Sequence, residues 1–489
     1  MSSNDPHHEE QDEYLQADDA EEVFDRDEDQ DMDVDGEYND ENMTIEDEIT
    51  FQNDSAAHFD SHTDSVFCVA QHPVHNQIVL TGSGDDSGYI FDSTPAPRPV
   101  LPSSFETTPQ PREREALTPL AKLDGHTDTV NAVTFTEPAG EYAITAGLDG
   151  KLLEEINWIA VCPYQKGSEE HKNVIAIGAN DGSAWVFRID HTDPSNPISI
   201  IQTFFSHTES CTAGAWTPDG NLLATVSEDG SFFVYDVFGA AAAAGIEYSP
   251  GTNAILSLNA EDQRFAVIGG LYTIAISPSG GIAAVGGAEG NIRVVGLPRI
   301  TASGPSAKGK GAAPKSAGAT AAGTIMASLQ TQTDNVESLS FSQVPFTLLA
   351  ASSVDGSIVM YDAAHRFAVR RHIQEAHDGA PVVKVEFLPS HRQAGAAVSG
   401  PLASASAAQN NRSWMLTSVG LDGVVRRWDA RGGTTAAAQG LMQEWKGHMG
   451  LTENEDGEQS GGIMGFVQNF DGKRIVTAGD DGISLVFEE

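Results

Sequence analysis

Histidines and aspartates recur along this chain at a nearly constant separation. The first three pairs, 23, 23 and 22 residues apart, are His62 with Asp85, His126 with Asp149, and His207 with Asp229. A histidine held by a carboxylate is the arrangement that general-base and nucleophilic catalysis use. An enzyme needs one such pair, whereas regular repetition is typical of scaffolding. We therefore expect each histidine to hydrogen-bond towards its acid and to fix a loop to a turn.

The acids belong to eight copies of one short pattern. Each copy has an apolar run, then Asp-Gly or a near match, then an alternating apolar segment that often ends in an aromatic residue and Asp. The copies begin at Asp85, Asp149, Asp181, Asp229, Glu289, Asp355, Asp422 and Asp481. Asp-Gly between apolar runs predicts a hairpin turn, because glycine tolerates a positive φ. The histidines expected to be structural are His62, His126, His207, His377 and His448.

Two further apolar runs, such as SCTAGAWTP and NLLATVSE, separate a histidine from its turn acid. This order predicts one four-stranded antiparallel sheet per unit, which is typical of WD repeats. We expect an all-β WD40 β-propeller of eight blades over residues 44–489. Because the chain ends at Glu489, directly after a third strand, residues 44–53 are expected to close the ring. In that closure Glu48–Phe51 would pair with Ser484–Phe487.

One interval between turn acids is short. Asp149 and Asp181 are 32 residues apart, so too little chain remains near 149–156 for the rest of a third strand, an outer strand and a histidine loop. Either the second blade is truncated, or the sequence lacks a segment through a gene-model gap or a splice variant. The open sheet edge that truncation would leave favours the second alternative. Longer intervals are explained by loop insertions at 93–119, 298–323 and 390–412.

Composition limits the partners of the chain. The net charge is −44, and residues 1–48 hold 22 acidic residues and one base, Arg26. Residues 1–43 are expected to be a disordered acidic tail, because so few apolar side chains cannot offset the entropy lost on ordering. Direct nucleic-acid binding is not expected, since phosphate contacts need clustered Lys and Arg. A basic protein or peptide is the expected partner.

Cysteine usage and hydropathy indicate the compartment. Cys68, Cys162 and Cys211 form no CxxC pair, which indicates a reducing environment. No signal sequence is present, and no apolar run approaches the ~18 residues of a membrane span. We expect a soluble, monomeric, cytoplasmic protein, with a nuclear pool left open. Because no GxSxG elbow, P-loop or HExxH motif is present, we expect no enzymatic activity, no cofactor and no metal.

Carboxylates occupy one register just before the expected inner strands. Two residues ahead of the first core position lie Asp64, Asp128, Glu154, Glu209 and Asp334, with Asp378 nearby in the seventh unit. Glu228 and Asp480 directly precede turn acids on the same face. These eight acids are the predicted partner-binding residues, because a ring of them would focus negative potential at one mouth of the central channel. The alternative is that loop positions carry Asp and Glu by chance or as local caps.

With its acidic leader, its eight units and its first blade DSVFCVAQHPVHNQIVLTGSGDDSGYIFD, the chain resembles a known WD-repeat family. That family contains a fungal ribosome-assembly chaperone and the animal angio-associated migratory cell protein. The resemblance spans about residues 44–489 and implies an eight-bladed propeller. It also implies capture of the basic N-terminal end of the large-subunit ribosomal protein L10 and its delivery to the pre-60S particle. The short second unit departs from the family pattern and leaves the position of Glu154 in question.

Two other functions stay open from the residues alone. A histone-binding or general protein-interaction scaffold would also prefer basic tails. The stretch Trp428-Asp429-Ala430-Arg431 matches the WDxR pattern of substrate receptors for cullin-RING ubiquitin ligases. A repeat that already supplies Trp-Asp makes this second match weak.

Overall fold

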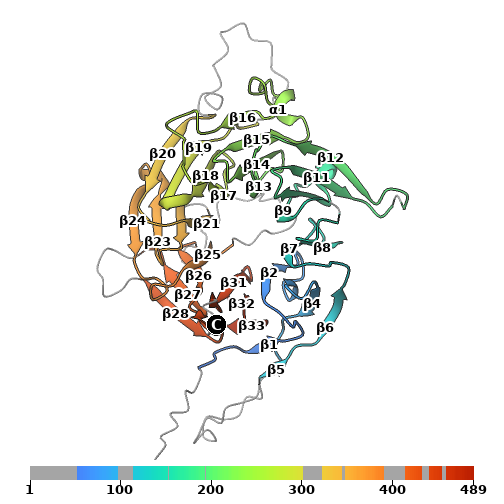
Figure 1. Ribbon diagram of the computed structural model, residues 1–489, viewed down its shortest axis with the longest axis vertical. Helices are drawn as coiled ribbons and strands as arrows, with labels where there is room; N and C mark the ends of the chain where they lie inside the picture. Colours follow the sequence, from blue (N-terminus) through green and yellow to red (C-terminus); the bar gives the residue numbers. More distant parts are fainter. Residues whose placement is uncertain are drawn as a thin grey trace, which may run out of the picture. The chain divides into compact units, whose positions relative to one another are not determined.

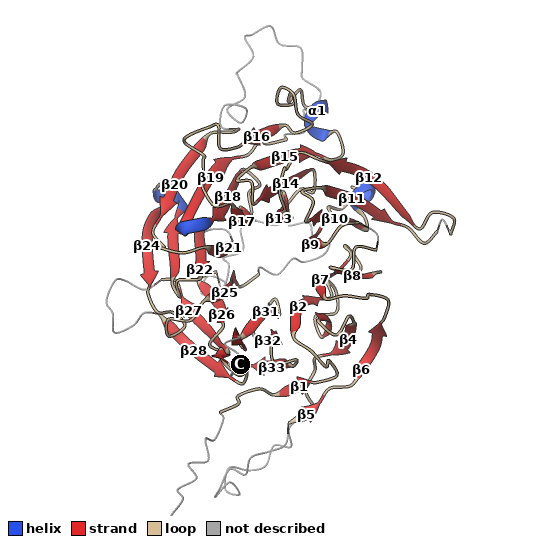
Figure 2. Cartoon of the chain, in the orientation of Figure 1, coloured by secondary structure: helices blue, strands red, loops and turns tan. Residues whose placement is uncertain are grey.

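The computed structural model describes residues 52–96, 114–151, 153–192, 194–300, 322–343, 347–389, 413–431, 440–453 and 459–489. All of them belong to one compact unit that begins at Phe51. Figure 2 shows that strands dominate this unit. Among the described residues the helical segments are α1 (Ala240–Ala243) and the single 3-10 turns Glu169–His171, Ala288–Gly290 and Ala363–His365. The predicted acidic tail, and residues 44–51 of the predicted closing segment, lie outside the described residues.

Strands of four kinds, from inner to outer, repeat along the chain. The inner strands are β2 (Val66–Gln71), β7 (Val130–Phe135), β9 (Ile156–Val161), β13 (Cys211–Trp216), β17 (Leu271–Ile276), β21 (Val336–Phe341), β25 (Val382–Phe387) and β31 (Ile463–Gln468). The second strands are β3 (Ile78–Ser83), β8 (Ala143–Gly147), β10 (Val174–Ala179), β14 (Leu222–Ser227), β18 (Ile282–Gly287), β22 (Leu348–Ser353), β26 (Met415–Gly420) and β32 (Arg474–Gly479).

Third and outer strands complete most of these units. The third strands are β4 (Gly88–Asp92), β11 (Ala184–Ile189), β15 (Phe232–Asp236), β19 (Asn291–Gly296), β23 (Ile358–Asp362), β27 (Val424–Asp429) and β33 (Ser484–Glu488). The outer strands are β6 (Pro119–Leu123), β12 (Ile198–Phe204), β16 (Leu256–Leu258), β20 (Ile325–Gln330), β24 (Ala368–Ile373), β28 (Leu441–Lys446) and β1 (Ala57–Phe59). Three two-residue strands also occur, β5 (Glu115–Ala116), β29 (Thr452–Glu453) and β30 (Gln459–Ser460).

The inner strands form a closed ring. Each inner strand contacts the next in chain order, and β31 contacts β2 (Figure 1). The prediction of an all-β WD40 β-propeller is therefore confirmed. The count of eight blades is wrong, because the described residues form seven sheets of four or five strands and a two-stranded β7–β8 hairpin in the second position. Between the Gly150 turn and Ile156 the chain is too short for two more strands at about 3.3 Å per residue.

The ring is closed by a strand other than the one expected from the sequence. Ala57, His58 and Phe59 of β1 pair antiparallel with Val486, Leu485 and Ser484 of β33. Because β32 occupies the other edge of β33, the predicted pairing of Glu48–Phe51 with this strand is wrong. The physical reason is burial: Ala57 and Phe59 are fully buried, and the Phe59 ring stacks on Phe91 with centroids 4.2 Å apart.

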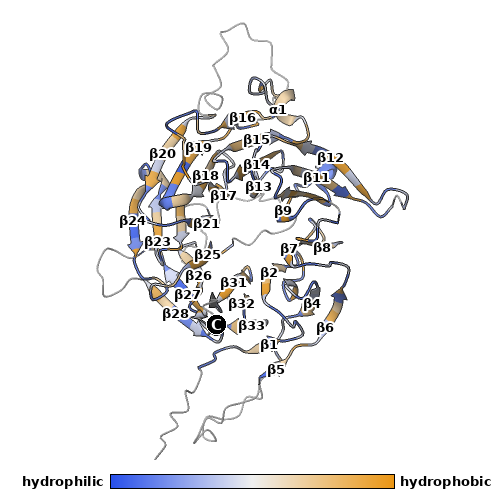
Figure 3. Ribbon diagram, viewed as in Figure 1, coloured by the Kyte–Doolittle hydropathy of each residue, from blue (hydrophilic) through white to orange (hydrophobic). Residues whose placement is uncertain are grey.

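The incomplete second unit leaves one sheet face uncovered. Phe187 of β11 belongs to an apolar cluster against which Ile144 of β8 packs, and its cross-strand partner on β12 is Ile200. Paired residues share a face, so Ile200 points to the side where the second unit has no third or outer strand. Ile200 is 57% exposed, and Ile198 beside it is 49% exposed. Figure 3 shows the alternation of hydrophobic and hydrophilic residues along β12 that accompanies this exposure.

Candidate functional site

The histidines named from the sequence lie on the same end of the sheets as the turn acids, here called the Asp-turn face. In four units the Nδ1 atom of the histidine lies within 3.1 Å of its turn carboxylate. The pairs are His62–Asp85 at 2.9 Å, His126–Asp149 at 3.1 Å, His377–Asp422 at 2.8 Å and His448–Asp481 at 3.0 Å. The Nε2 atom of each contacts a hydroxyl of the second strand, as His62 does with Thr81 at 2.9 Å. These contacts tie the loop before each inner strand to the turn.

Two units use variants of this arrangement, and in a third, that of Asp181, the turn acid keeps its contact with the turn backbone. His207 shares its Nδ1 with the Ser231 hydroxyl at 2.6 Å, while the nearest oxygen of Asp229 is 3.8 Å away. In the unit of Asp355 the histidine position is taken by Gln332, whose Nε2 donates to the Ser357 hydroxyl. Sequence reasoning missed Gln332, although it lies two residues before Asp334, as His62 lies before Asp64. Asp181 accepts a hydrogen bond from the Ser183 N–H at 2.8 Å.

Hydrogen bonds hold the pKa values of three turn acids, Asp85, Asp355 and Asp422, below their usual range. Burial opposes ionisation of Asp85, but hydrogen bonds from Ser87 and His62 outweigh it and hold its pKa below the usual value. The pKa of Asp355 is likewise lowered against burial, by hydrogen bonds from Ser357 and the Thr333 N–H. At Asp422 the donor that outweighs burial is His377, and the pKa is again lowered. This chemistry stabilises turns, and it leaves these acids engaged with the protein itself.

Five carboxylates predicted to bind a partner stand at the start of inner strands with their side chains exposed: Asp64, Asp128, Glu154, Glu209 and Asp334. Three of them share one local geometry, in which Oδ1 accepts the next residue's N–H at 2.7 Å. The carbonyls of Asp64, Glu209 and Asp334 also accept a hydroxyl from Ser83, Ser227 and Ser353, respectively. The repeated contacts place Asp64, Glu209 and Asp334 at equivalent points of three blades. Each still offers a carboxylate to solvent.

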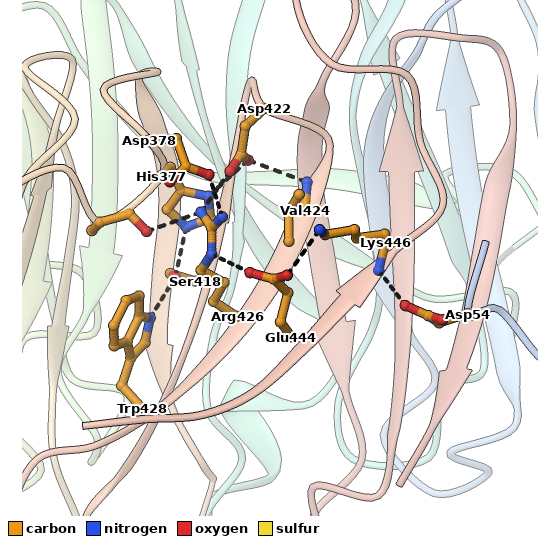
Figure 4. Close-up of polar contacts among 11 residues, drawn as sticks. Asp54, His377, Asp378, Ser418, Asp422, Val424, Arg426, Trp428, Glu444 and Lys446 are labelled. Carbon is orange, nitrogen blue, oxygen red and sulfur yellow. Dashed lines mark hydrogen bonds and ion pairs between the residues drawn. The ribbon is translucent and has the colours of Figure 1, made fainter. Parts of the chain in front are cut away.

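The other three predicted partner-binding acids lie in different settings. Glu228 is exposed beside its turn, whereas Asp480 is half-buried and accepts the Gly461 N–H. Asp378 Oδ2 lies 2.7 Å from Arg426 Nη2. Figure 4 shows Asp378 among the polar residues drawn around Arg426. The buried Arg426 also contacts Asp422 at 2.6 Å and Glu444 at 3.0 Å. Asp378 therefore belongs to a local charge cluster.

A β-bulge recurs at the second residue of every inner strand. The ladder to the second strand skips one residue there, as between Val66 and Cys68 or between Val336 and Ser338. The skipped residues are Phe67, Asn131, Asn157, Thr212, Tyr272, Glu337, Val383 and Met464. Bulges of this kind re-aim a side chain. The eight bulged residues follow the predicted carboxylate register and belong to the same mouth of the ring.

Glu337 adds a carboxylate that sequence reasoning missed. It is the bulged residue of β21, three positions after Asp334, and its side chain reaches solvent. Restricted solvation, followed by the nearby charge of Asp334, raises its pKa above the usual value. A cationic group of a partner would relieve the repulsion between Glu337 and Asp334. With Glu337 the mouth of the ring carries more carboxylates than the eight predicted from the sequence.

Chemistry other than charge is sparse on the described part of the chain. No cluster of three or more His, Cys, Asp or Glu there could hold a metal, and no helix there is long and apolar enough to cross a bilayer. Burial raises the pKa of the Cys211 thiol to about 12 and also raises the pKa values of Cys68 and Cys162. Arg431 of the WDxR match contacts its neighbour Asp429 through Nε and Nη2.

Comparison with known proteins identifies both the repeat and its relatives. The model of the family described as WD domain, G-beta repeat, matches residues 53–92, 117–153 and 198–236. The crystal structure of Chaetomium thermophilum Sqt1 bound to the N-terminus of the ribosomal protein L10 is 44% identical in sequence, with a TM-score of 0.71. The match covers 90% of this chain and 100% of that chain.

Several curated proteins also match at lower identity, and two of them carry names that bear on function. The ribosome assembly protein SQT1 of Saccharomyces cerevisiae is 27% identical over 231 residues, which cover 42% of this chain and 48% of that protein. Human angio-associated migratory cell protein is 24% identical over 442 residues, which cover 89% of this chain and 80% of that protein.

Proposed function

The chain belongs to the Sqt1 family of WD-repeat proteins, and on this premise we propose that it is a non-catalytic chaperone for the ribosomal protein L10. It captures the N-terminal region of L10 and delivers the protein to the pre-60S particle. One observation carries the proposal: the relative that is 44% identical over its whole length was crystallised with the L10 N-terminus bound. The family resemblance stated from the sequence is thereby confirmed.

The chemistry of the Asp-turn face supports this role. Ribosomal proteins contact rRNA phosphates through Lys and Arg, so away from the ribosome they carry unpaired cationic surface. Asp64, Asp128, Glu209 and Asp334 offer exposed carboxylates, and within the described ranges no Lys or Arg forms an ion pair with them. Such carboxylates stand in for phosphates. Because ribosomal proteins are made in the cytoplasm, we place the capture step there.

Charge reversal tests the site. The full-length quadruple variant D64K/D128K/E209K/D334K is expected to lose capture of an L10 N-terminal peptide while keeping the circular dichroism spectrum of the wild type. A matched control reverses four acids on loops at the opposite end of the strands: Glu170, Asp219, Asp190 and Asp471. The control is expected to bind the peptide with nearly wild-type affinity, because charges farther apart than the Debye length of ~8 Å are screened at physiological salt.

Two results would overturn the assignment. Wild-type affinity in the quadruple variant would remove these carboxylates from the site. Stronger binding of a histone-tail peptide of equal charge than of the L10 peptide would instead favour a general scaffold for basic tails.

A further inference from the structure

Large apolar side chains stand exposed on the Asp-turn face. Ile268 is 88% exposed, Phe205 is 68% exposed and Met449 is 55% exposed. Each lies in a loop that leads from an outer strand to the next inner strand: Phe205 between β12 and β13, Ile268 between β16 and β17, and Met449 between β28 and β31. The loop of Phe205 also carries His207 and the register carboxylate Glu209, and the loop of Met449 carries His448. Exposed apolar groups rimmed by polar ones are typical of interaction sites.

Ile268 lies next to carboxylates. Its loop packs on the turn of the preceding blade, because a Cβ added to Gly270 would be 2.9 Å from the Glu228 carbonyl oxygen. Tyr272, the bulged residue of β17, donates its hydroxyl to the Gly269 carbonyl in the same loop. Glu228 lies on the turn against which this loop packs, and Glu337 is the bulged residue of the adjoining inner strand β21. Burial, followed by the charges of these two acids, raises the pKa of Tyr272. Two carboxylates and two large side chains therefore share this sector.

A second sector combines the same two kinds of group. A Cβ added to Gly84 would be 3.0 Å from Asp64 Oδ2 and 3.3 Å from Phe67 Cε2, so this carboxylate and this ring are neighbours. The Ser65 hydroxyl donates to the Asp480 carbonyl, and the Asp480 N–H donates to Gly462. Gly462 in turn donates to the Met449 carbonyl. These hydrogen bonds connect the Met449 backbone to Asp480 and to Ser65, the residue that follows Asp64.

The third sector is aromatic. The Phe205 ring meets the Trp185 ring edge-to-face, with centroids 5.7 Å apart. The loop that begins at Phe205 covers the turn of Trp185's sheet, because a Cβ on Gly182 would be 2.6 Å from the Glu209 carbonyl oxygen. Large apolar groups therefore lie beside carboxylates in two sectors of the face and beside another aromatic ring in the third.

We propose that this face selects client segments in which Arg or Lys alternates with aromatic or large aliphatic side chains, and that Ile268, Phe205 and Met449 anchor the apolar members. The proposal rests on the proposed function and specifies the client chemistry at the same site. Carboxylates attract any cationic chain, and salt screens that attraction. Salt does not screen apolar contacts, and these contacts form only when the client has a large side chain to bury. Their combination would exclude plain polylysine-like tails.

Two synthetic peptides of equal length and charge test the proposal, one alternating Arg with Tyr and one alternating Arg with Ser. Titration calorimetry with the full-length protein at about 0.5 M salt, where the Debye length falls below ~8 Å, suppresses the shared electrostatic attraction. The Arg–Tyr peptide is expected to bind about tenfold tighter or more. The variant F205S/I268S/M449S is expected to abolish that difference and to leave the weak binding of the Arg–Ser peptide unchanged.

A matched control removes exposed apolar groups on outer strands, in the variant L120S/I200S/V369S. It should retain the preference of the wild type for the Arg–Tyr peptide. Equal affinities of the two peptides for the wild type, or an undiminished preference in F205S/I268S/M449S, would overturn the proposal. Failure of the L10 N-terminal peptide to bind would instead refute the proposed function, so the two failures are distinguishable.

Discussion

Truncation of Phe59 to alanine tests how the ring is closed. Phe59 is fully buried. Its ring stacks on Phe91 with centroids 4.2 Å apart and meets the Tyr89 ring edge-to-face with centroids 5.5 Å apart. Removing a buried phenyl ring costs about 3–5 kcal/mol in lost transfer free energy and cavity formation. Most of the apolar burial that attaches β1 to the ring comes from Phe59, because β1 has three residues and only Ala57 and Phe59 point into the core.

Equilibrium urea unfolding, followed by tryptophan fluorescence and circular dichroism, measures this cost. The free energy of unfolding of Phe59→Ala is expected to fall by about 3–5 kcal/mol, with the two probes in agreement. Val74→Ala serves as the control, because Val74 is 56% exposed and its truncation should change stability by less than about 0.5 kcal/mol. A loss below about 1 kcal/mol in Phe59→Ala would refute closure of the ring by β1.

Three further changes have defined outcomes. Arg426→Met leaves Asp378, Asp422 and Glu444 without their shared guanidinium and should lower the free energy of unfolding in urea by about 3–5 kcal/mol. Arg431→Met, which breaks the half-exposed ion pair with Asp429, should lower it by less than ~1 kcal/mol. Equal losses in the two variants would contradict the role of Arg426 as the centre of a buried charge cluster. Gly214→Ala places a Cβ 2.1 Å from Trp158 Cη2 and should lower the free energy of unfolding by about 1–3 kcal/mol. Gly465→Ala on another inner strand is the control, because the atom nearest to its Cβ would be 4.0 Å away, and it should unfold near the wild-type urea midpoint. The pKa values of Asp85, Asp355 and Asp422 are lowered in the folded protein, so the stability that these carboxylates contribute is complete above the unfolded pKa of ~4 and is lost as pH falls through the folded values. The melting temperature should therefore drop below about pH 4, and it should drop less steeply in Asp355→Asn. A melting temperature that rises on such acidification would contradict this sign.

Local patterns in the sequence were enough to identify the repeat. Asp-Gly turns and apolar runs predict the strands, and a constant spacing predicts contacts such as that of His62 with Asp85. The predicted number of blades was wrong because each of the eight repeated turns was taken to indicate a complete blade, whereas the unit of Asp149 has only its inner and second strands. The closing strand was misplaced because alternation alone does not distinguish residues 48–51 from 57–59. Stacking on Phe91, a tertiary contact, decides between them.

The candidate site was predictable only in part. The register of Asp64, Glu209 and Asp334 follows from their distance to the first core residue. Glu337 was missed because a bulge is defined by the partner strand and not by local sequence. The engagement of Asp378 with Arg426, 48 residues away, likewise depends on the fold.

Hydrogen–deuterium exchange of the full-length protein, with and without an L10 N-terminal peptide, tests the central claim most directly. Binding at the Asp-turn face should slow exchange in the loops that enter inner strands: residues 62–67, 126–131, 207–212 and 332–337. Loops at the opposite end, such as 217–221 and 469–473, should exchange at unchanged rates. Protection confined to those opposite loops would contradict the account, because the client would then lie at the end of the ring away from the carboxylates.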